Sequence, residues 1–229
     1  RDQFLVSDWQ RAQANCKRAV KITMPGPMTI SDTNHDAFYH DPQKLGRDIA
    51  EALNVEVLAL AGAGCVHIQI DEPLFARKPQ AALDYGFENL ERAFHGCPNN
   101  VQRTVHMCCG YPDKLDRDDY PKADPDSYLQ IADAIEYSSI DAVSFEDAHR
   151  HNDLSLLERL PTTKVIFGVV AIAKSEVESV DDIRERLGQA LHPIDGDGLI
   201  GAPDCGLGLL GRDLAMATLK NMCSAARSL

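Results

Sequence analysis

The sequence predicts an α/β fold built from parallel strands, and two observations support that prediction. Short apolar runs alternate with longer stretches of helical period along the 229-residue chain. This alternation is typical of parallel strands joined by right-handed crossovers. In addition, polar residues suited to catalysis or metal binding stand where the apolar runs end, and a (β/α)8 barrel assembles its active site at that place. We therefore expect a TIM-type (β/α)8 barrel.

Six strands are expected, each from an apolar or β-branched run. They cover residues 20–24, 66–71, 101–108, 142–145, 164–171 and 199–202. A closed barrel of this type needs eight strands. The alternatives are an open sheet or a barrel that lacks its first N-terminal units. The absence of an initiator Met favours a truncated or processed chain.

Five helices are expected between and after these strands, several of them opened by Asp or Ser as an N-cap. They cover residues 42–61, 81–94, 126–137, 180–191 and 212–226. The sequence shows no internal repeat, low-complexity tract or linker. We therefore expect one barrel domain over residues 1–229, partial in its strand count.

The composition excludes several classes of partner. A hydrophobic fraction of 44% is ordinary for a globular protein. A formal net charge of -12 argues against nucleic acid and anionic membranes as partners, because both require a basic surface. No apolar stretch approaches the length of a membrane span, and the first residues do not resemble a signal peptide. The expected location is the cytoplasm.

The seven cysteines do not resemble a disulfide framework, because an odd number leaves at least one thiol unpaired. A reducing compartment leaves thiols free to bind metal. Cys109 adjoins Cys108 but faces the opposite way on a continuing strand, so it is left out of any metal site. Small buried side chains are expected at Cys16, Cys65, Cys97 and Cys223.

Four residues with metal-binding chemistry stand at strand ends. His106 and Cys108 are two residues apart on one predicted strand, so both side chains face the same way. Glu146 and Cys205 follow the ends of two later strands. A histidine beside a buried cysteine is more often ordinary packing than a ligand pair. Two thiolates, an imidazole and a carboxylate nevertheless suffice to close a tetrahedral zinc site, and their shared position favours a metal.

Four segments, in this order, resemble the C-terminal catalytic barrel of the cobalamin-independent methionine synthase family, including its single-domain thiol methyltransferase and alkyltransferase relatives. They read PGPMTI at 25–30, QIDEP at 69–73, TVHMC at 104–108 and APDCGL at 202–207. The resemblance extends from about residue 20 to residue 226. It implies a barrel whose first N-terminal strand and helix units have no counterpart in this chain.

The resemblance also implies a reaction, the zinc-dependent transfer of a methyl or other alkyl group to a small thiol such as homocysteine. The implied Zn²⁺ ligands are His106, Cys108, Glu146 and Cys205. Glu146 is in addition the ligand that an incoming thiol would displace. Asp71 is implied as the carboxylate that holds the substrate ammonium group, with Gln69 on the same face as a supporting substrate contact. Asp71 has a structural alternative, because Asp often caps turns.

Two departures from the family pattern concern the methyl donor. Thr33 stands where folate-using members have a tryptophan, and Ala173 stands where they have a proton-donating histidine. We therefore expect a methyl donor other than methyltetrahydrofolate bound in the usual way. Two alternatives stay open: alkyl transfer to a thiol of the coenzyme M type, and an inactive zinc-stabilised homologue that acts as a binding protein. The sequence also leaves open whether the chain forms a homo-oligomer.

Overall fold

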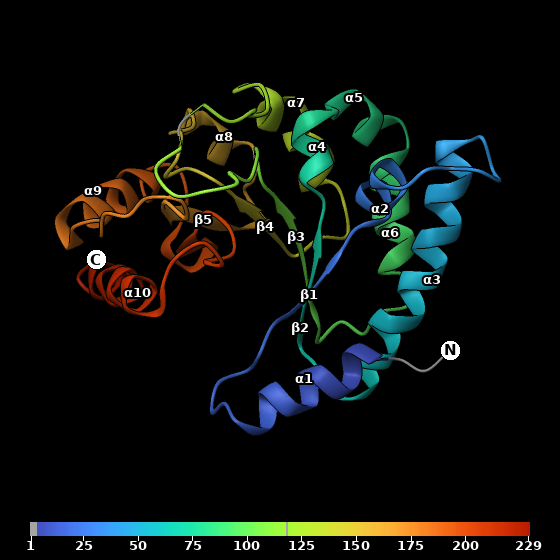
Figure 1. The fold of residues 1–229 in the computed structure, drawn as a ribbon, viewed down its shortest axis with the longest axis horizontal. Helices are drawn as coiled ribbons and strands as arrows, with labels where there is room; N and C mark the ends of the chain where they lie inside the picture. Colours follow the sequence, from blue (N-terminus) through green and yellow to red (C-terminus); the bar gives the residue numbers. More distant parts are fainter. Residues whose placement is uncertain (1–3, 118) are drawn as a thin grey trace.

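The protein forms a parallel α/β sheet in which the strands follow one another in chain order. The computed structural model describes residues 4–117 and 119–229. Its six strands are all parallel and neighbours in the chain are neighbours in the sheet (Figure 1). They are β1 (Ile22–Pro25), β2 (His67–Asp71), β3 (Gln102–Met107), β4 (Ala142–Phe145), β5 (Lys164–Val170) and β6 (Leu199–Pro203). All six predicted strands are confirmed. Among the described residues no pairing joins β1 to β6.

Helices follow the strands in the order that crossover connections require. The longer ones are α1 (Phe4–Ala14), α3 (Pro42–Gly62), α7 (Ser127–Glu136), α9 (Val180–Ala190) and α10 (Arg212–Ala226). The shorter ones are α2 (Pro27–Thr33), α4 (Pro73–Arg77), α5 (Pro79–Ala81), α6 (Phe87–Ala93) and α8 (Ser155–Glu158). None of the described helices combines the length and the apolar character needed to cross a membrane.

The predicted caps are present on two of the long helices. The Asp41 carboxylate accepts hydrogen bonds from the backbone N–H groups of Gln43 and Lys44 at the start of α3, and the Ser179 hydroxyl accepts one from Asp182 at the start of α9. The helix predicted over 81–94 is interrupted, because a π-helical segment, Ala82–Gly86, separates α5 from α6. Helices α1, α2, α4 and α8 lie outside the predicted set. Both α2 and α4 have a proline at the first position, which suits a helix start.

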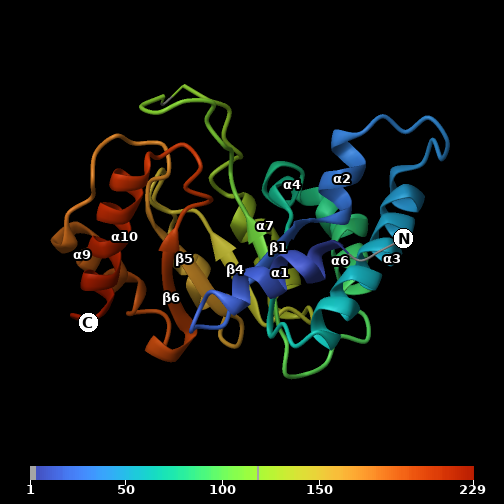
Figure 2. The same cartoon turned by 60° about the horizontal axis from the view of Figure 1, so that its bottom comes forward.

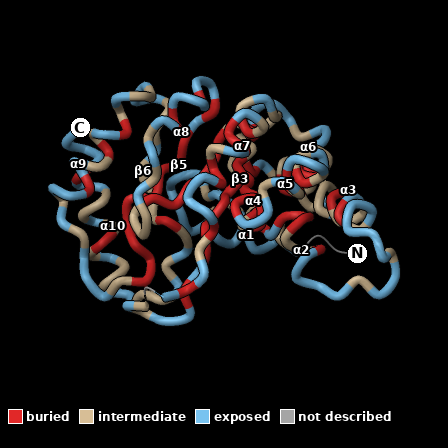
Figure 3. The backbone as a smooth tube through the Cα atoms, turned by 90° about the horizontal axis from the view of Figure 1, so that it is seen from above, coloured by how far each residue is buried: buried red, intermediate tan, exposed pale blue. Residues whose placement is uncertain are grey.

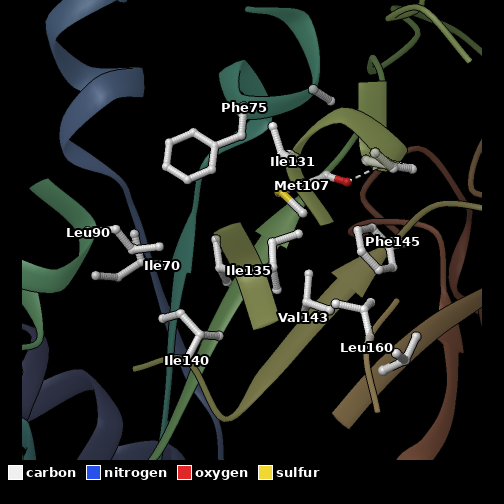
Figure 4. Packing of buried hydrophobic residues seen from close by; sticks show 14 of the residues in the cluster. Ile70, Phe75, Leu90, Met107, Ile131, Ile135, Ile140, Val143, Phe145 and Leu160 are labelled. Atoms are coloured by element: carbon white, nitrogen blue, oxygen red, sulfur yellow. Dashed lines mark hydrogen bonds between the residues drawn. The ribbon is translucent and has the colours of Figure 1, made fainter. Parts of the chain in front are cut away.

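One face of the sheet packs against helices and forms the core. A single row of paired residues along this face runs through Met24, Ile70, Val105, Val143 and Val165, and each is buried. Figure 4 shows this face in contact with buried helix residues, among them Phe75, Leu90, Ile131 and Ile135. In the view from above, the buried residues concentrate along the strands and the exposed ones on the outer helices (Figure 3).

The opposite face of the sheet bears polar side chains near the carboxyl ends of the strands. Asp71, His106 and Ser144 are direct neighbours on β2, β3 and β4. The long segment between β3 and α7 rises above this edge of the sheet (Figure 2). The architecture therefore gathers loops from distant parts of the chain at one edge, as expected from the strand ends.

The predictions for the four remaining cysteines are only partly confirmed. Cys65 is buried and Cys97 is half-buried, whereas Cys16 and Cys223 are exposed. Cys16 follows the end of α1, and Cys223 lies on the exposed side of α10. The helical context of these two cysteines was therefore not enough to predict their burial. All seven thiols are free.

Candidate metal centre

Three of the four predicted ligands converge at the carboxyl edge of the sheet. His106 lies on β3, Cys108 directly follows it, and Cys205 follows β6. One ligand atom from each of these residues lies within 4.8 Å of the other two. Residues separated by almost half of the chain thus meet at a spacing that a single cation can bridge.

The histidine is oriented as a metal ligand would be. His106 Nδ1 lies 2.9 Å from the Ser144 hydroxyl, which fixes the ring from the neighbouring strand. His106 Nε2 is buried and has no hydrogen-bond partner among the described residues. A buried polar atom without a partner is costly, and a metal-ligating histidine typically uses its second nitrogen as His106 uses Nδ1. The arrangement fits a cation bound at Nε2.

The two thiols interact with each other. A hydrogen bond between Cys108 and Cys205 lowers the pKa of Cys205 and raises the pKa of Cys108. A thiophilic metal would displace the proton between them and bind both sulfurs as thiolates.

Glu146 lies beside this cluster but is not one of its three close members. The side chain is buried, and Glu146 Oε1 has no hydrogen-bond partner among the described residues. Burial, together with the charges of Asp204 and Cys205, raises the pKa of Glu146 to about 8. A buried carboxylate oxygen without a partner fits the donor set of a zinc site. The fourth ligand position stays a prediction.

The predicted substrate contacts, Gln69 and Asp71, lie side by side on β2. Gln69 Nε2 donates to Asp71 Oδ1 at 2.7 Å, and Thr23 Oγ1 donates to Asp71 Oδ2 at 2.5 Å. The ammonium group of Lys21 in turn donates to Gln69 Oε1. Lys21 and Thr23 were not predicted from the sequence. Lys21 directly precedes β1, and Thr23 lies on β1 opposite Gln69, so their two-residue spacing is the signal that could have indicated them.

A further carboxylate beside this site, Glu72, was not predicted from the sequence. Its side chain is fully buried and accepts hydrogen bonds from the backbone N–H groups of Met28 and Thr29, both at 2.9 Å, and from the Thr29 hydroxyl at 2.7 Å. Burial outweighs these bonds and raises the pKa of Glu72 to about 7. Gly26 is required beside it, because a Cβ there would lie 2.2 Å from the Glu72 carboxyl carbon. Glu72 therefore ties β2 to the start of α2.

Asp204, the residue before Cys205, organises the loop that follows Glu146. Its two carboxylate oxygens accept hydrogen bonds of 2.8 to 2.9 Å from the backbone N–H groups of Asp147, Ala148 and His149. Burial raises the pKa of Asp204 to about 6, although these three N–H groups act in the opposite direction. The segments that contain Cys205 and Glu146 are thus held together by one buried side chain.

The fold and this cluster define a class: a parallel α/β protein with two cysteines and a histidine that could hold a metal ion at the carboxyl ends of its strands. Comparison with known proteins then identifies the family. Residues 2–228 match the family model described as cobalamin-independent synthase, catalytic domain. The chain belongs to this family, as the motifs of the sequence indicated.

Individual relatives agree with this assignment. The chain is 28% identical over 227 residues to methionine synthase of Pyrococcus furiosus, covering 99% of this chain and 60% of the relative. It is 27% identical over 231 residues to methionine synthase of Saccharolobus solfataricus, covering 99% of this chain and 64% of the relative. The chain therefore spans about three-fifths of the length of these curated relatives.

A solved structure gives the same result. The B12-independent methionine synthase from Shewanella sp. W3-18-1, in complex with selenomethionine, superposes with a TM-score of 0.90 at 28% identity, covering 100% of this chain and 67% of that one. A second structure, a B12-independent methionine synthase from Listeria monocytogenes described as putative, has a TM-score of 0.71 at 17% identity and supports the fold alone. The barrel type predicted from the sequence is confirmed.

Proposed function

We propose that this chain is the catalytic part of a zinc-dependent methyltransferase that transfers a methyl group to the thiol of homocysteine and so produces methionine. The observation that supports the proposal is the convergence of His106, Cys108 and Cys205 beside two buried atoms without partners, His106 Nε2 and Glu146 Oε1. The donor set matches zinc, because thiolate and imidazole ligands are typical of its tetrahedral sites.

When bound, zinc would lower the pKa of a coordinated substrate thiol and provide a nucleophilic thiolate at neutral pH. The residues of the chain then have separate tasks in the proposal. Cys108, Cys205 and His106 would hold the ion, and Glu146 would complete the site until substrate arrives. Asp71, next to His106 in the sheet, would bind the ammonium group of the amino acid and so orient its thiol toward the cluster.

The methyl donor in this proposal is not methyltetrahydrofolate bound in the way usual for the family. The Thr33 hydroxyl is hydrogen-bonded to the backbone oxygen of Thr29 at 2.7 Å, within its own helix. Ala173 is buried, with 1% of its surface exposed. Neither position offers a stacking ring or an acid, which supports a donor of different chemistry.

The proposal predicts a selective loss of affinity in Asp71→Asn. Charge-assisted hydrogen bonds contribute about 1.5 to 3 kcal/mol, so homocysteine should bind the zinc-loaded variant about 10 to 100 times more weakly than the zinc-loaded wild type. The matched control ligand is 4-mercaptobutyrate, which has the same thiol and carboxylate but no amine. Its affinity should be unchanged. Isothermal titration calorimetry in buffers of different ionisation enthalpy measures both affinities and the proton released from the thiol.

Each result of this titration bears on one alternative. If Asp71→Asn weakens the binding of both ligands equally, or of neither, then Asp71 does not bind the ammonium group of the amino acid. Tighter binding of 2-mercaptoethanesulfonate than of homocysteine would favour a thiol of the coenzyme M type. A silent titration with zinc retained would favour the inactive binding protein.

A further inference from the structure

A tyrosine with no role in the proposed reaction lies between the two cysteine-bearing segments. Tyr111 stands three residues after Cys108, in the segment that joins β3 to α7. Its hydroxyl donates a hydrogen bond of 2.9 Å to the backbone oxygen of Gly206, which is 95 residues away in the sequence and directly follows Cys205. This bond links the segment that contains Cys108 to the segment that contains Cys205, at a point outside the cluster.

The same hydroxyl also lies close to a second residue of that turn. A Cβ added at Gly208 would lie 3.7 Å from the Tyr111 hydroxyl oxygen. The phenol oxygen therefore bonds the Gly206 carbonyl and lies near Gly208 in the same turn. Burial and the nearby Cys205 and Cys108 raise the pKa of Tyr111.

The turn has little side-chain packing of its own where it leaves Cys205. Gly206 and Gly208 are exposed, and a Cβ added at Gly206 would meet nothing within 4 Å. On the other side of Cys205, the carboxylate of Asp204 is buried and holds three backbone N–H groups. Cys205 is thus preceded by a buried, hydrogen-bonded residue and followed by an exposed glycine. The position of its sulfur therefore depends on the contacts that hold the turn after it.

We propose that Tyr111 is a positioning residue of the metal centre, whose hydroxyl holds the 206–209 turn and thereby keeps the Cys205 sulfur in place beside His106 and Cys108. The proposal rests on the zinc site of the proposed function but is tested separately from it. Removing a group that directly orients a metal ligand typically weakens metal binding 10- to 100-fold. Tyr111 acts through the backbone next to the ligand, so we expect a smaller effect, about 3- to 10-fold.

The test uses Tyr111→Phe, which removes only the hydroxyl, in the full chain. Tyr137→Phe is the matched control, because Tyr137 is 88% exposed at the end of α7. Transfer of zinc from the loaded protein to a colorimetric chelator should be about 3 to 10 times faster in Tyr111→Phe than in wild type. The rate in Tyr137→Phe should be unchanged. After replacement of zinc by Co²⁺, the thiolate-to-cobalt absorption band should shift only in Tyr111→Phe.

A second measurement needs no metal. Hydrogen exchange of the metal-free protein, followed by mass spectrometry, should show faster exchange in Tyr111→Phe for the peptide that contains residues 205–211 and unchanged exchange in β4 and β5. Unchanged exchange in that peptide, or a uniform increase over the whole chain, would overturn the proposal. Equal zinc transfer in the three proteins would also overturn it. If wild type retains no zinc, the proposed function fails, and the exchange measurement still decides the role of Tyr111.

Discussion

Cys205→Ala is expected to lose stoichiometric zinc. Within residues 4–117 and 119–229, only three residues bring their ligand atoms within 4.8 Å of one another, and this change removes one of the two sulfurs among them. It leaves His106 and Cys108, with Glu146 outside the close group, and two ligands do not make a stable zinc site. Zinc content, measured by elemental analysis after dialysis against metal-free buffer, should fall from about one per chain to near zero.

Two other cysteines provide controls for this experiment. Cys223→Ala changes an exposed thiol on α10 and should keep its zinc. Cys109→Ala changes a buried thiol next to a ligand, whose sulfur contacts the Tyr128 hydroxyl at 3.2 Å and the Arg150 guanidinium at 3.1 Å. It should lose some stability and retain the ion. Full zinc occupancy in Cys205→Ala would mean that the metal is bound elsewhere.

Arg186→Met is expected to destabilise the protein by about 3 to 5 kcal/mol. Arg186 makes a two-point ion pair with Asp147, at 2.6 and 2.8 Å, and Asp147 is fully buried beside Glu146. Methionine preserves much of the apolar stem but leaves the buried carboxylate without its counter-charge. Urea denaturation of the metal-free protein measures the change in the free energy of unfolding.

An exposed ion pair of similar chemistry gives the comparison for this variant. Arg159 contacts Asp133 at the surface, where the two side chains are 46% and 61% exposed. Arg159→Met should reduce the free energy of unfolding by about 1 kcal/mol or less, because solvent screens such pairs. If the two variants lose the same stability, the buried Asp147 does not depend on Arg186 in the way described.

The regular elements were predictable from sequence because their signals are local. Apolar runs of strand length located all six strands, and the helix of residues 212–226 has the predicted limits. The short helices α2, α4 and α8 were missed because one or two turns contain too few positions for a helical period to appear. The 11-residue helix α1 was missed as well. The π-helical interruption at Ala82–Gly86 likewise has no local signature that separates it from a continuous helix.

The candidate metal centre was predictable to the extent that each proposed ligand stands at a strand end. His106 and Cys108 share a face by strand alternation, and Cys205 follows β6 at the same edge of the sheet. The roles of Glu72 and Asp204 were not predictable, because they depend on backbone N–H groups from distant segments, the start of α2 and the loop after Glu146. Such contacts exist only in the folded chain, and no characteristic spacing of residues in the sequence indicates them.

X-ray absorption spectroscopy at the zinc edge of the loaded wild-type protein tests the central claim most directly. Coordination by Cys108 and Cys205 predicts a first shell with two sulfur atoms at about 2.3 Å and lighter ligands, from His106 and Glu146, at about 2.0 to 2.2 Å. A first shell of nitrogen and oxygen alone would contradict the account.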